Sequence, residues 1–412
     1  MQTRHAVALA LLAAVPAALV HLGILSVSVE IATLCYGLAI VGAAFAMSWG
    51  AEAAEHDIPR ALALSVVALL AVFPEYAVDI VFAVKAGQDP TFAPYAAANM
   101  TGSNRLLLGL GWPTVSILAW RASGIKVLRL GRDAGLPLFF LGVATVYSFS
   151  LPLRANIGIV DCVVLVGLFL AYAVLAAREQ TTEPDLVGPA ATIGALPTNA
   201  RRLSILGLFV FAGVAIGAAA EPFAAGLVHT GQSLGIDEFL LVQWLAPLAS
   251  EAPEFLIAAL LAVRGKAGAA MGLLLSAKLN QWTLLVGSLP LAYSVGAGHL
   301  AALPLDNRQA AEVLLTAAQS LFGIAVLASM SLSLFEAALL AGLFVAQLVL
   351  GGLLRTMLHN AQGGEVELII FSVVYVLLSL FFLYQARRVV RLLWSNGRPK
   401  KKAHHAPIPR SG

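Results

Sequence analysis

The sequence predicts an all-α protein with many membrane-spanning helices. Of its 412 residues, 60% are hydrophobic and 11% are charged, and its mean hydropathy is +0.88. Because a soluble domain has about 25% charged residues, this composition excludes an ordinary soluble protein. Most of the chain forms continuous apolar stretches of about 20 residues, the length that spans a hydrocarbon core as a helix. These stretches do not alternate as transmembrane β-barrel strands do.

About twelve apolar stretches are the expected spanning helices, since a helix satisfies its own backbone hydrogen bonds in lipid. The first could instead be a signal peptide, but its run is long for one and lacks a clear cleavage site, so we favour a retained helix. The stretches lie at about 6–27, 31–52, 60–84, 91–118, 136–152, 157–177, 203–228, 238–262, 268–294, 309–330, 333–354 and 366–386.

Polar segments divide the chain into two membrane halves with additions at each end. The longest polar stretch, 178–202, contains three prolines and indicates a cytoplasmic linker. The expected parts are an extra N-terminal helix in 1–30, a first half in 31–177, the linker in 178–202, a second half in 203–355, an extra C-terminal helix in 356–395 and a basic tail in 396–412.

Basic residues gather in alternate loops of this arrangement. The loops after the fourth, sixth, eighth and twelfth helices hold the clusters, whereas the other loops hold scattered single charges. The positive-inside rule then places both termini in the cytoplasm, in a multi-pass protein of the cell inner (plasma) membrane. The basic tail indicates a topology anchor, with binding to anionic lipid as the alternative. The clusters include Arg121, Lys126, Arg129, Arg132, Arg201, Arg202, Arg264, Lys266, Arg387 and Arg388.

Two segments of the chain are alike, and each carries a Pro-Glu pair. Residues 73–87 read FPEYAVDIVFAVKAG, and residues 252–266 read APEFLIAALLAVRGK, so that Glu75 aligns with Glu254. They lie in the third and eighth expected helices, which an odd number of crossings separates. The two copies therefore run in opposite directions through the membrane, as in the inverted repeats of secondary transporters.

A Pro-Glu pair inside a membrane suits cation binding. Proline removes one helical hydrogen bond and frees a carbonyl one turn earlier. An ionised carboxylate at mid-bilayer costs at least several kcal/mol unless it is paired or coordinates an ion. Glu75 and Glu254 would share this cost by binding a cation between them. A lone glutamate is often only a protonated hydrogen-bonding group, but two in matched contexts argue against that interpretation.

The helix after each Pro-Glu segment is the second part of the repeat. It reads ANMTGSNRLLLGLGWP at 98–113 and MGLLLSAKLNQWTLLVGSLP at 271–290, and small residues such as Gly102 and Ser276 allow close helix contact. With these motifs the chain resembles the sodium/calcium exchanger (cation/calcium antiporter) superfamily, whose repeats typically read GTSLPE…GNVVGSN. The resemblance covers about 36–120 and 205–295. It implies two inverted five-helix repeats, plus one extra helix at each end.

The resemblance also implies a set of ion-binding residues. Glu75 and Glu254 match the central glutamates that hold the metal cation, Na⁺ or Ca²⁺. Two further carboxylates, Asp79 and Glu251, lie one helical turn from them on the same helix faces. The remaining implied ligands are polar and uncharged: Asn99, Ser103, Asn104, Ser250, Asn280 and Gln281.

The chain departs from the family motif in several places. Ala71-Val72 replaces the first Thr-Ser pair, and Leu107 occupies a position that usually holds a ligand. The spacing is 27 residues from Glu75 to Gly102 but 22 from Glu254 to Ser276, so the first repeat has five extra residues (27 − 22), which we place in 88–94.

Two basic residues, Lys278 and Arg105, lie on the partner helices of the repeats. Because an unpaired charge in lipid is costly, we expect Lys278 to pair with Glu251 or Glu254, and Arg105 with Asp79 or Glu75. A lysine in the site would take the space and charge of a metal cation, which favours a monovalent cation with protons as counter-substrate. Desolvation disfavours the charged lysine, so cation binding could expel its proton. The alternative is that both residues form fixed structural pairs, as we expect for Asp161, Glu312 and Glu336.

These features predict a secondary active cation antiporter that works by alternating access. It would exchange Na⁺, or another monovalent cation such as K⁺, against H⁺ or Ca²⁺. The alternative is a transport-inactive membrane scaffold or sensor whose site is filled by Lys278 and Arg105. The sequence has no HExxH motif and no GxxxxGK[ST] loop, so we expect no enzyme, no cofactor and no nucleic-acid partner. The expected partners are small inorganic cations and the lipid bilayer.

Overall fold

The computed structural model describes residues 3–54, 73–131, 134–178, 186–235, 237–358 and 361–396. Several predicted features fall wholly or partly outside these ranges. They are the first part of the expected helix at 60–84 with Ala71-Val72, loop residue Arg132, part of the linker at 179–185, and the basic tail after Asn396.

The described chain is almost entirely helical, and its elements follow the apolar stretches of the sequence. The helices are α1 (Thr3–Leu12), α2 (Val15–His21), α3 (Val29–Ala54), α5 (Phe73–Gln88), η1 (Pro90–Phe92), α6 (Ala93–Leu106), η2 (Leu107–Gly111), α7 (Trp112–Ser123), α8 (Gly135–Ser148), α9 (Ser150–Arg154), α10 (Ile159–Ala176), α11 (Pro189–Gly194), α12 (Thr198–Leu234), α13 (Glu238–Ser250), α14 (Ala252–Val263), α15 (Ala267–Asn280), η4 (Gln281–Leu285), α16 (Val286–Ala297), α17 (Asn307–Leu327), α18 (Leu334–Leu358) and α19 (Ala361–Asn396). The short strands are β1 (Val127–Arg129), β2 (Asn156–Ile157), β3 (Leu303–Pro304) and β4 (Ser331–Ser333).

Seven helices of the described residues are long and apolar enough to cross a membrane, or up to eight if the bent pair α13 and α14 is one span. This confirms a helical membrane protein, while the count of twelve stays a prediction. The stretch expected as one helix at 6–27 forms two shorter helices, α1 and α2. The expected linker at 178–202 contains α11 and the start of α12, and is thus partly helical.

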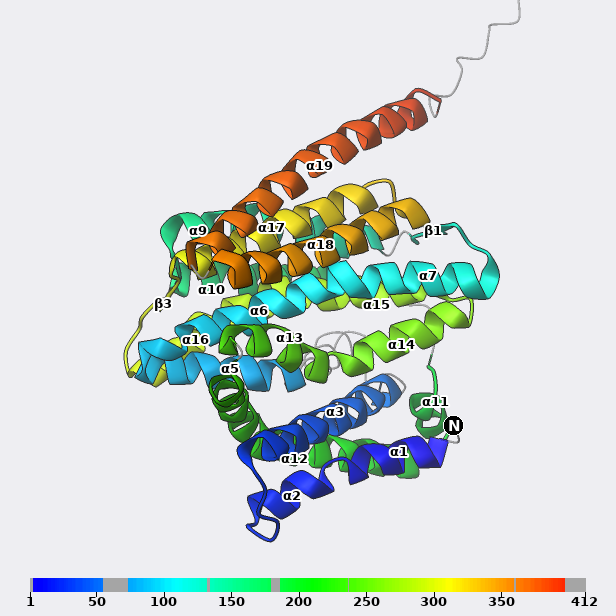
Figure 1. The fold of residues 1–412 in the computed structure, drawn as a ribbon. Helices are drawn as coiled ribbons and strands as arrows, with labels where there is room; N and C mark the ends of the chain where they lie inside the picture. The colour runs from blue at the N-terminus through cyan, green and yellow to red at the C-terminus, as the bar shows by residue number, and fades with distance from the viewer. Residues whose placement is uncertain are drawn as a thin grey trace, which may run out of the picture.

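The helices form three layers (Figure 1). Helices α1, α2, α3 and α12 form one outer layer, in which α3 packs along α12. Helices α17, α18 and α19 form the opposite layer. Between them lie the two segments that carry the Pro-Glu pairs and the helices that follow them. The two Pro-Glu segments therefore occupy the centre of the molecule.

The central helices pack reciprocally. Helix α5 of the first repeat packs against α16 of the second, and α14 of the second packs against α7 of the first. Each repeat also contains a π-helical turn, which starts at Leu107 in η2 and at Gln281 in η4. These two positions are equivalent when Gly102 is aligned with Ser276. A π-helical turn inside an α-helix is often found at a functional site.

Two short antiparallel strand pairs connect the halves of the chain. Strand β1 pairs with β4, with Leu128 opposite Leu332. Strand β2 pairs with β3, with Ile157 opposite Leu303. Each pair joins a loop of the first half to a loop of the second.

Glycine brings α6 into close contact with α13. A Cβ atom added at Gly102 would lie 1.8 Å from the backbone oxygen of Gln243, so α13 leaves no room for a side chain there. The close approach that the small residue predicted is present. It brings the second helix of the first repeat against the middle of α13.

We predict that Gly102→Ala destabilises the protein. The methyl group would force α6 and α13 apart, and overpacking of this kind costs about 1–3 kcal/mol. The melting temperature of the detergent-purified variant measures the effect. The control is Gly272→Ala on α15, where an added Cβ meets nothing within 4 Å and no loss of stability is expected. An unchanged melting temperature for Gly102→Ala would contradict this packing.

Candidate functional site

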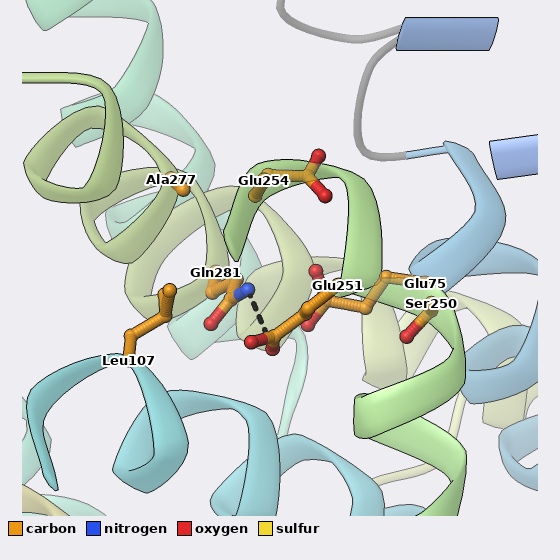
Figure 2. Close-up of a pocket in the computed structure, with 7 residues that line it drawn as sticks. All are labelled: Glu75, Leu107, Ser250, Glu251, Glu254, Ala277 and Gln281. Carbon is orange, nitrogen blue, oxygen red and sulfur yellow. Dashed lines mark hydrogen bonds between the residues drawn. The ribbon is translucent and has the colours of Figure 1, made fainter. Parts of the chain in front are cut away.

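A small cavity lies where the two repeats meet (Figure 2). Five of its lining residues are among the ion-binding residues predicted from sequence, and two are apolar. Residue Glu75 comes from α5, Leu107 from η2, and the others from the helices around the α13–α14 break and the α15–η4 junction. The lining residues are Glu75, Leu107, Ser250, Glu251, Glu254, Ala277 and Gln281.

The break between α13 and α14 places three of these side chains. The two helices are bent by 54° relative to each other, and Glu251 lies between them. Pro253 stands in the first turn of α14, where its missing N–H costs no helical hydrogen bond. Helix α14 therefore starts at the cavity, and Ser250, Glu251 and Glu254 enter it from successive positions around the bend.

Several oxygens of the cavity residues are buried without a hydrogen-bond partner. They are Glu75 Oε1, Glu251 Oε2, Glu254 Oε2 and Gln281 Oε1. Glu251 uses its other oxygen to accept a hydrogen bond of 3.0 Å from Gln281 Nε2. A buried polar atom left without a partner costs about 1–3 kcal/mol, so this arrangement gains stability when a proton or a cation occupies the cavity.

The carboxyl groups enter the cavity from different directions. Glu75 and Glu251 are buried, with 3% of each exposed, whereas Glu254 is half-buried. In Figure 2 the side chains of Glu75 and Glu251 point to the same region, while the carboxyl group of Glu254 points away from it. The two predicted central glutamates thus line one cavity, but their carboxyl groups point in different directions.

No group of three or more His, Cys, Asp or Glu side chains among the described residues is arranged to hold a metal ion by itself. A cation in this cavity would therefore need ligands other than carboxylates. Ser250 Oγ and Gln281 Oε1 supply oxygens of this kind, which hard cations such as Ca²⁺ accept together with carboxylates.

The other predicted ligands lie outside the cavity lining. Asp79 and Asn99 are fully buried, and none of their side-chain oxygen or nitrogen atoms has a hydrogen-bond partner. Ser103 donates to the backbone oxygen of Asn99. Asn280 accepts a hydrogen bond of 2.9 Å from the hydroxyl of Tyr76. The Tyr76–Asn280 hydrogen bond connects α5 with α15, and Asn99 and Ser103 both lie on α6.

Lys278 is fully buried, and its contacts differ from the prediction. Its ammonium donates to Asn104 Oδ1 at 2.8 Å and to the Asn104 backbone oxygen at 3.1 Å. It also lies 4.7 Å from the ring centre of Trp282. The expected contact with Glu251 or Glu254 is not formed, because the side chain extends across to α6 and does not line the cavity.

Arg105 forms a buried ion pair, but the predicted partner was wrong. Its guanidinium bonds Glu312 on α17 and Gln347 on α18, and it lies 5.0 Å from the ring of Trp244. Consecutive residues of an α-helix lie about 100° apart, so Arg105 leaves α6 on a different face from Asn104, and it contacts α17 and α18. The structural pairing expected for Glu312 is therefore confirmed.

Two of the residues set aside as structural also have the expected role. Asp161 is held by Arg154 at 2.5 Å and by the hydroxyl of Tyr147 at 2.6 Å. Glu336 accepts from Ser333 at the start of α18. Tyr76 and Gln347 were not among the functional residues predicted from the sequence. Gln347 did have a signal in the sequence, since it is a polar residue within the apolar stretch at 333–354.

The comparison with protein families decides the identity of this fold. A family described as "Sodium/calcium exchanger protein" matches residues 29–178 and 204–351, which is most of the chain. The chain belongs to the sodium/calcium exchanger family. Members of this family are transporters, so this chain is a cation antiporter of the sodium/calcium exchanger type.

Solved structures of exchangers share this fold. The crystal structure of the H⁺/Ca²⁺ exchanger CAX is 42% identical in sequence, with a TM-score of 0.87, over 96% of this chain and 97% of that chain. Native YfkE is 14% identical, with a TM-score of 0.57, over 91% and 99%. The sodium-calcium exchanger NCX_Mj is 16% identical, with a TM-score of 0.52, over 78% and 98%. The last two show the fold alone.

A search of curated proteins gave no match. The family match confirms the resemblance on which the sequence analysis relied, including its membrane and antiporter assignments. The alternative of a transport-inactive scaffold receives no support from these likenesses.

We predict that Arg105→Leu strongly destabilises the exchanger, because it leaves Glu312 buried without its counter-charge. Breaking a buried ion pair in this way costs about 3–5 kcal/mol. Thermal unfolding of the purified protein measures the loss, and the double substitution Arg105→Leu/Glu312→Leu should recover most of it.

The control for this prediction is Lys85→Leu. Lys85 pairs with Glu221, which is 68% exposed, and exposed pairs contribute about 0–1 kcal/mol. Equal losses for Arg105→Leu and Lys85→Leu, or no recovery in the double variant, would contradict the assigned pairing.

Proposed function

We propose that this exchanger transports Ca²⁺ in exchange for H⁺. The observation that supports the proposal is a cavity lined by Glu75, Glu251 and Glu254, each with one buried oxygen that has no hydrogen-bond partner. The exchanger of 42% identity is described as an H⁺/Ca²⁺ exchanger, which supports the same pair of substrates here. Of the residues predicted to bind ions, we assign the cation to Glu75 and Glu254, with Ser250 and Gln281 as uncharged ligands.

The cost of burying charge explains why a cation and protons would exchange. In an empty cavity, ionised carboxylates are too costly, so protons neutralise them. A divalent cation supplies the same compensation, and replacing two protons by one Ca²⁺ leaves the total charge of the cavity unchanged. Each substrate thus stabilises the buried acids, and neither can leave without the other taking its place.

The contacts of Lys278 remove the reason to prefer a monovalent cation. That preference assumed that the ammonium fills the cavity. Because Lys278 bonds Asn104 instead, the space between the carboxyl groups is free for a substrate ion. Exchange of Na⁺ or K⁺ becomes the competing hypothesis, and the transport assay below includes it.

We also propose that the two halves are inverted repeats. If one half is superposed on the other, α5 corresponds to α14 and α7 corresponds to α16. The packing of α5 on α16 then corresponds to the packing of α14 on α7. The same superposition exchanges the pair β1–β4 with the pair β3–β2. Both correspondences support a pseudo-two-fold axis through the cavity, about which alternating access would open the site to either side.

The proposed setting is the cell inner (plasma) membrane, with both termini in the cytoplasm. The basic loops after alternate helices support this orientation. With the binding site near the bilayer centre, a proton gradient across this membrane would drive Ca²⁺ out of the cytoplasm.

We predict that proteoliposomes containing the protein take up ⁴⁵Ca²⁺ when the lumen is acidic. The outward proton gradient drives the uptake, and a protonophore should abolish it. Glu75→Gln and Glu254→Gln should each lower the rate at least ~10-fold, which corresponds to about 1.4 kcal/mol of lost stabilisation. Asp89→Asn, an exposed carboxylate that caps η1, is the matched control and should leave uptake unchanged.

The same vesicles separate the competing functions. Uptake of ²²Na⁺ or ⁸⁶Rb⁺ driven by the proton gradient, with no ⁴⁵Ca²⁺ uptake, would favour the monovalent exchanger. Uptake of ⁴⁵Ca²⁺ that needs a sodium gradient and ignores the proton gradient would replace H⁺ by Na⁺ as the counter-ion. Absence of any gradient-driven flux would contradict antiport altogether.

A further inference from the structure

One buried hydrogen bond joins the two halves of the chain through residues that are adjacent in sequence to the cavity lining. The hydroxyl of Tyr76 on α5 donates to Asn280 Oδ1, at the end of α15, at 2.9 Å. Only 7% of Tyr76 and 3% of Asn280 are exposed. Loss of either partner would therefore leave the other polar group buried and unpaired.

This bond restricts the separation of two residues that line the cavity. Glu75 precedes Tyr76, Gln281 follows Asn280, and both of these neighbours are lining residues. Consecutive Cα atoms are about 3.8 Å apart, so a bond between two residues also limits how far their neighbours can separate. Gln281 in turn donates to Glu251 at 3.0 Å. Two hydrogen bonds in series thus connect α5, the α15–η4 junction and the α13–α14 break, which supply all the polar lining residues.

The equivalent ring of the second repeat packs in the same way. Tyr76 packs against Leu285, the last residue of η4. Phe255, which aligns with Tyr76, lies against Gly111, the last residue of η2, since a Cβ atom added there would lie 2.7 Å from its ring. Positions 285 and 111 are equivalent in the alignment that relates η4 to η2. The two aromatic rings therefore occupy matching places in the two halves.

Only the first of these two rings has the hydrogen bond. Phe255 has no hydroxyl, and Leu106 stands at the position equivalent to Asn280. Phenylalanine and leucine thus fill the same places in the second repeat, so the packing of these helices does not itself require a hydroxyl and an amide. Because the bonded pair adjoins Glu75 and Gln281, we look for its effect in the cavity.

We propose that Tyr76 and Asn280 are positioning residues, whose hydrogen bond sets the distance between Glu75 and the Ca²⁺ ligands of the second half. Glu75 is the one ligand that we assign to the first half of the chain. A cation held between the halves needs oxygens from both at coordination distance, so its affinity depends on this separation. Asn280, which the family resemblance implied as a ligand, then acts through its bond to Tyr76. This inference rests on the proposed exchange of Ca²⁺ for H⁺.

Proton-driven ⁴⁵Ca²⁺ uptake into proteoliposomes tests this role. The variants are Tyr76→Phe, Asn280→Leu and the double variant, which carry the residues that the second repeat has at these positions. Each should raise the KM for Ca²⁺ about 3- to 10-fold, as expected for the loss of one hydrogen bond, with the maximal rate within about two-fold of the wild type. Tyr95→Phe, the same change at a half-buried tyrosine of α6 outside the cavity lining, is the matched control and should keep the wild-type KM.

The melting temperatures of the same variants distinguish positioning from a purely structural role. Each single variant leaves a buried polar group unpaired and should be less stable, whereas the double variant removes both groups and should recover most of the loss. The bond is still missing in the double variant, so its KM should stay raised although its stability returns. A KM that recovers together with the melting temperature, or an unchanged KM in Tyr76→Phe, would overturn the proposal.

Binding of Ca²⁺ separates failure of this role from failure of the proposed function. If the wild type shows no proton-driven uptake, the proposed function fails, and Ca²⁺ binding is measured by the rise that it causes in melting temperature. The Ca²⁺ concentration at which this rise begins should then be about 3- to 10-fold higher for Tyr76→Phe than for the wild type. An unchanged concentration, or a wild type that does not respond to Ca²⁺, would contradict the positioning role.

Discussion

The free-energy cost of placing charge in the bilayer interior controls this structure. Each buried acid of the central helices must meet a proton, a basic group or a cation, because water is absent. Arg105 meets this need for Glu312 within the fold itself. In the cavity, by contrast, Glu75 and Glu254 each have a buried oxygen without a hydrogen-bond partner in the protein. This difference separates a structural ion pair from a site that can bind and release substrates.

The backbone of the central helices makes such a cavity possible. The bend between α13 and α14 interrupts a span at the second Pro-Glu pair, so Ser250, Glu251 and Glu254 all line one cavity. The contact at Gly102 brings α6 against the middle of α13. The π-helical turns begin at two lining residues of the cavity, Leu107 and Gln281. Because apolar Leu107 and amide Gln281 occupy equivalent positions, the two halves line the cavity with unequal side chains.

Much of the fold and part of the site were predictable from sequence, because their signals are local. Apolar length gave the helices, and the repeated Pro-Glu pair gave the cavity carboxylates Glu75 and Glu254. The partners of Arg105 and Lys278 were not predictable in this way. Glu312 lies 207 residues from Arg105, on a helix whose position depends on tertiary packing. The reach of Lys278 to Asn104 likewise depends on a neighbouring helix. The break in the expected helix at 6–27 does have a local signal, since Pro16 stands in the first turn of α2.

The location of a bound divalent cation decides whether this cavity is the transport site. Crystals of the protein soaked with Mn²⁺, which replaces Ca²⁺ at oxygen sites and gives an anomalous X-ray signal, would reveal it. We expect an anomalous peak between Glu75 and Glu254, with Ser250 or Gln281 as a further ligand, which disappears when the crystals are soaked at acidic pH. A peak outside this cavity, such as one between Asp79 and Asn99, or a peak unaffected by acid, would contradict it.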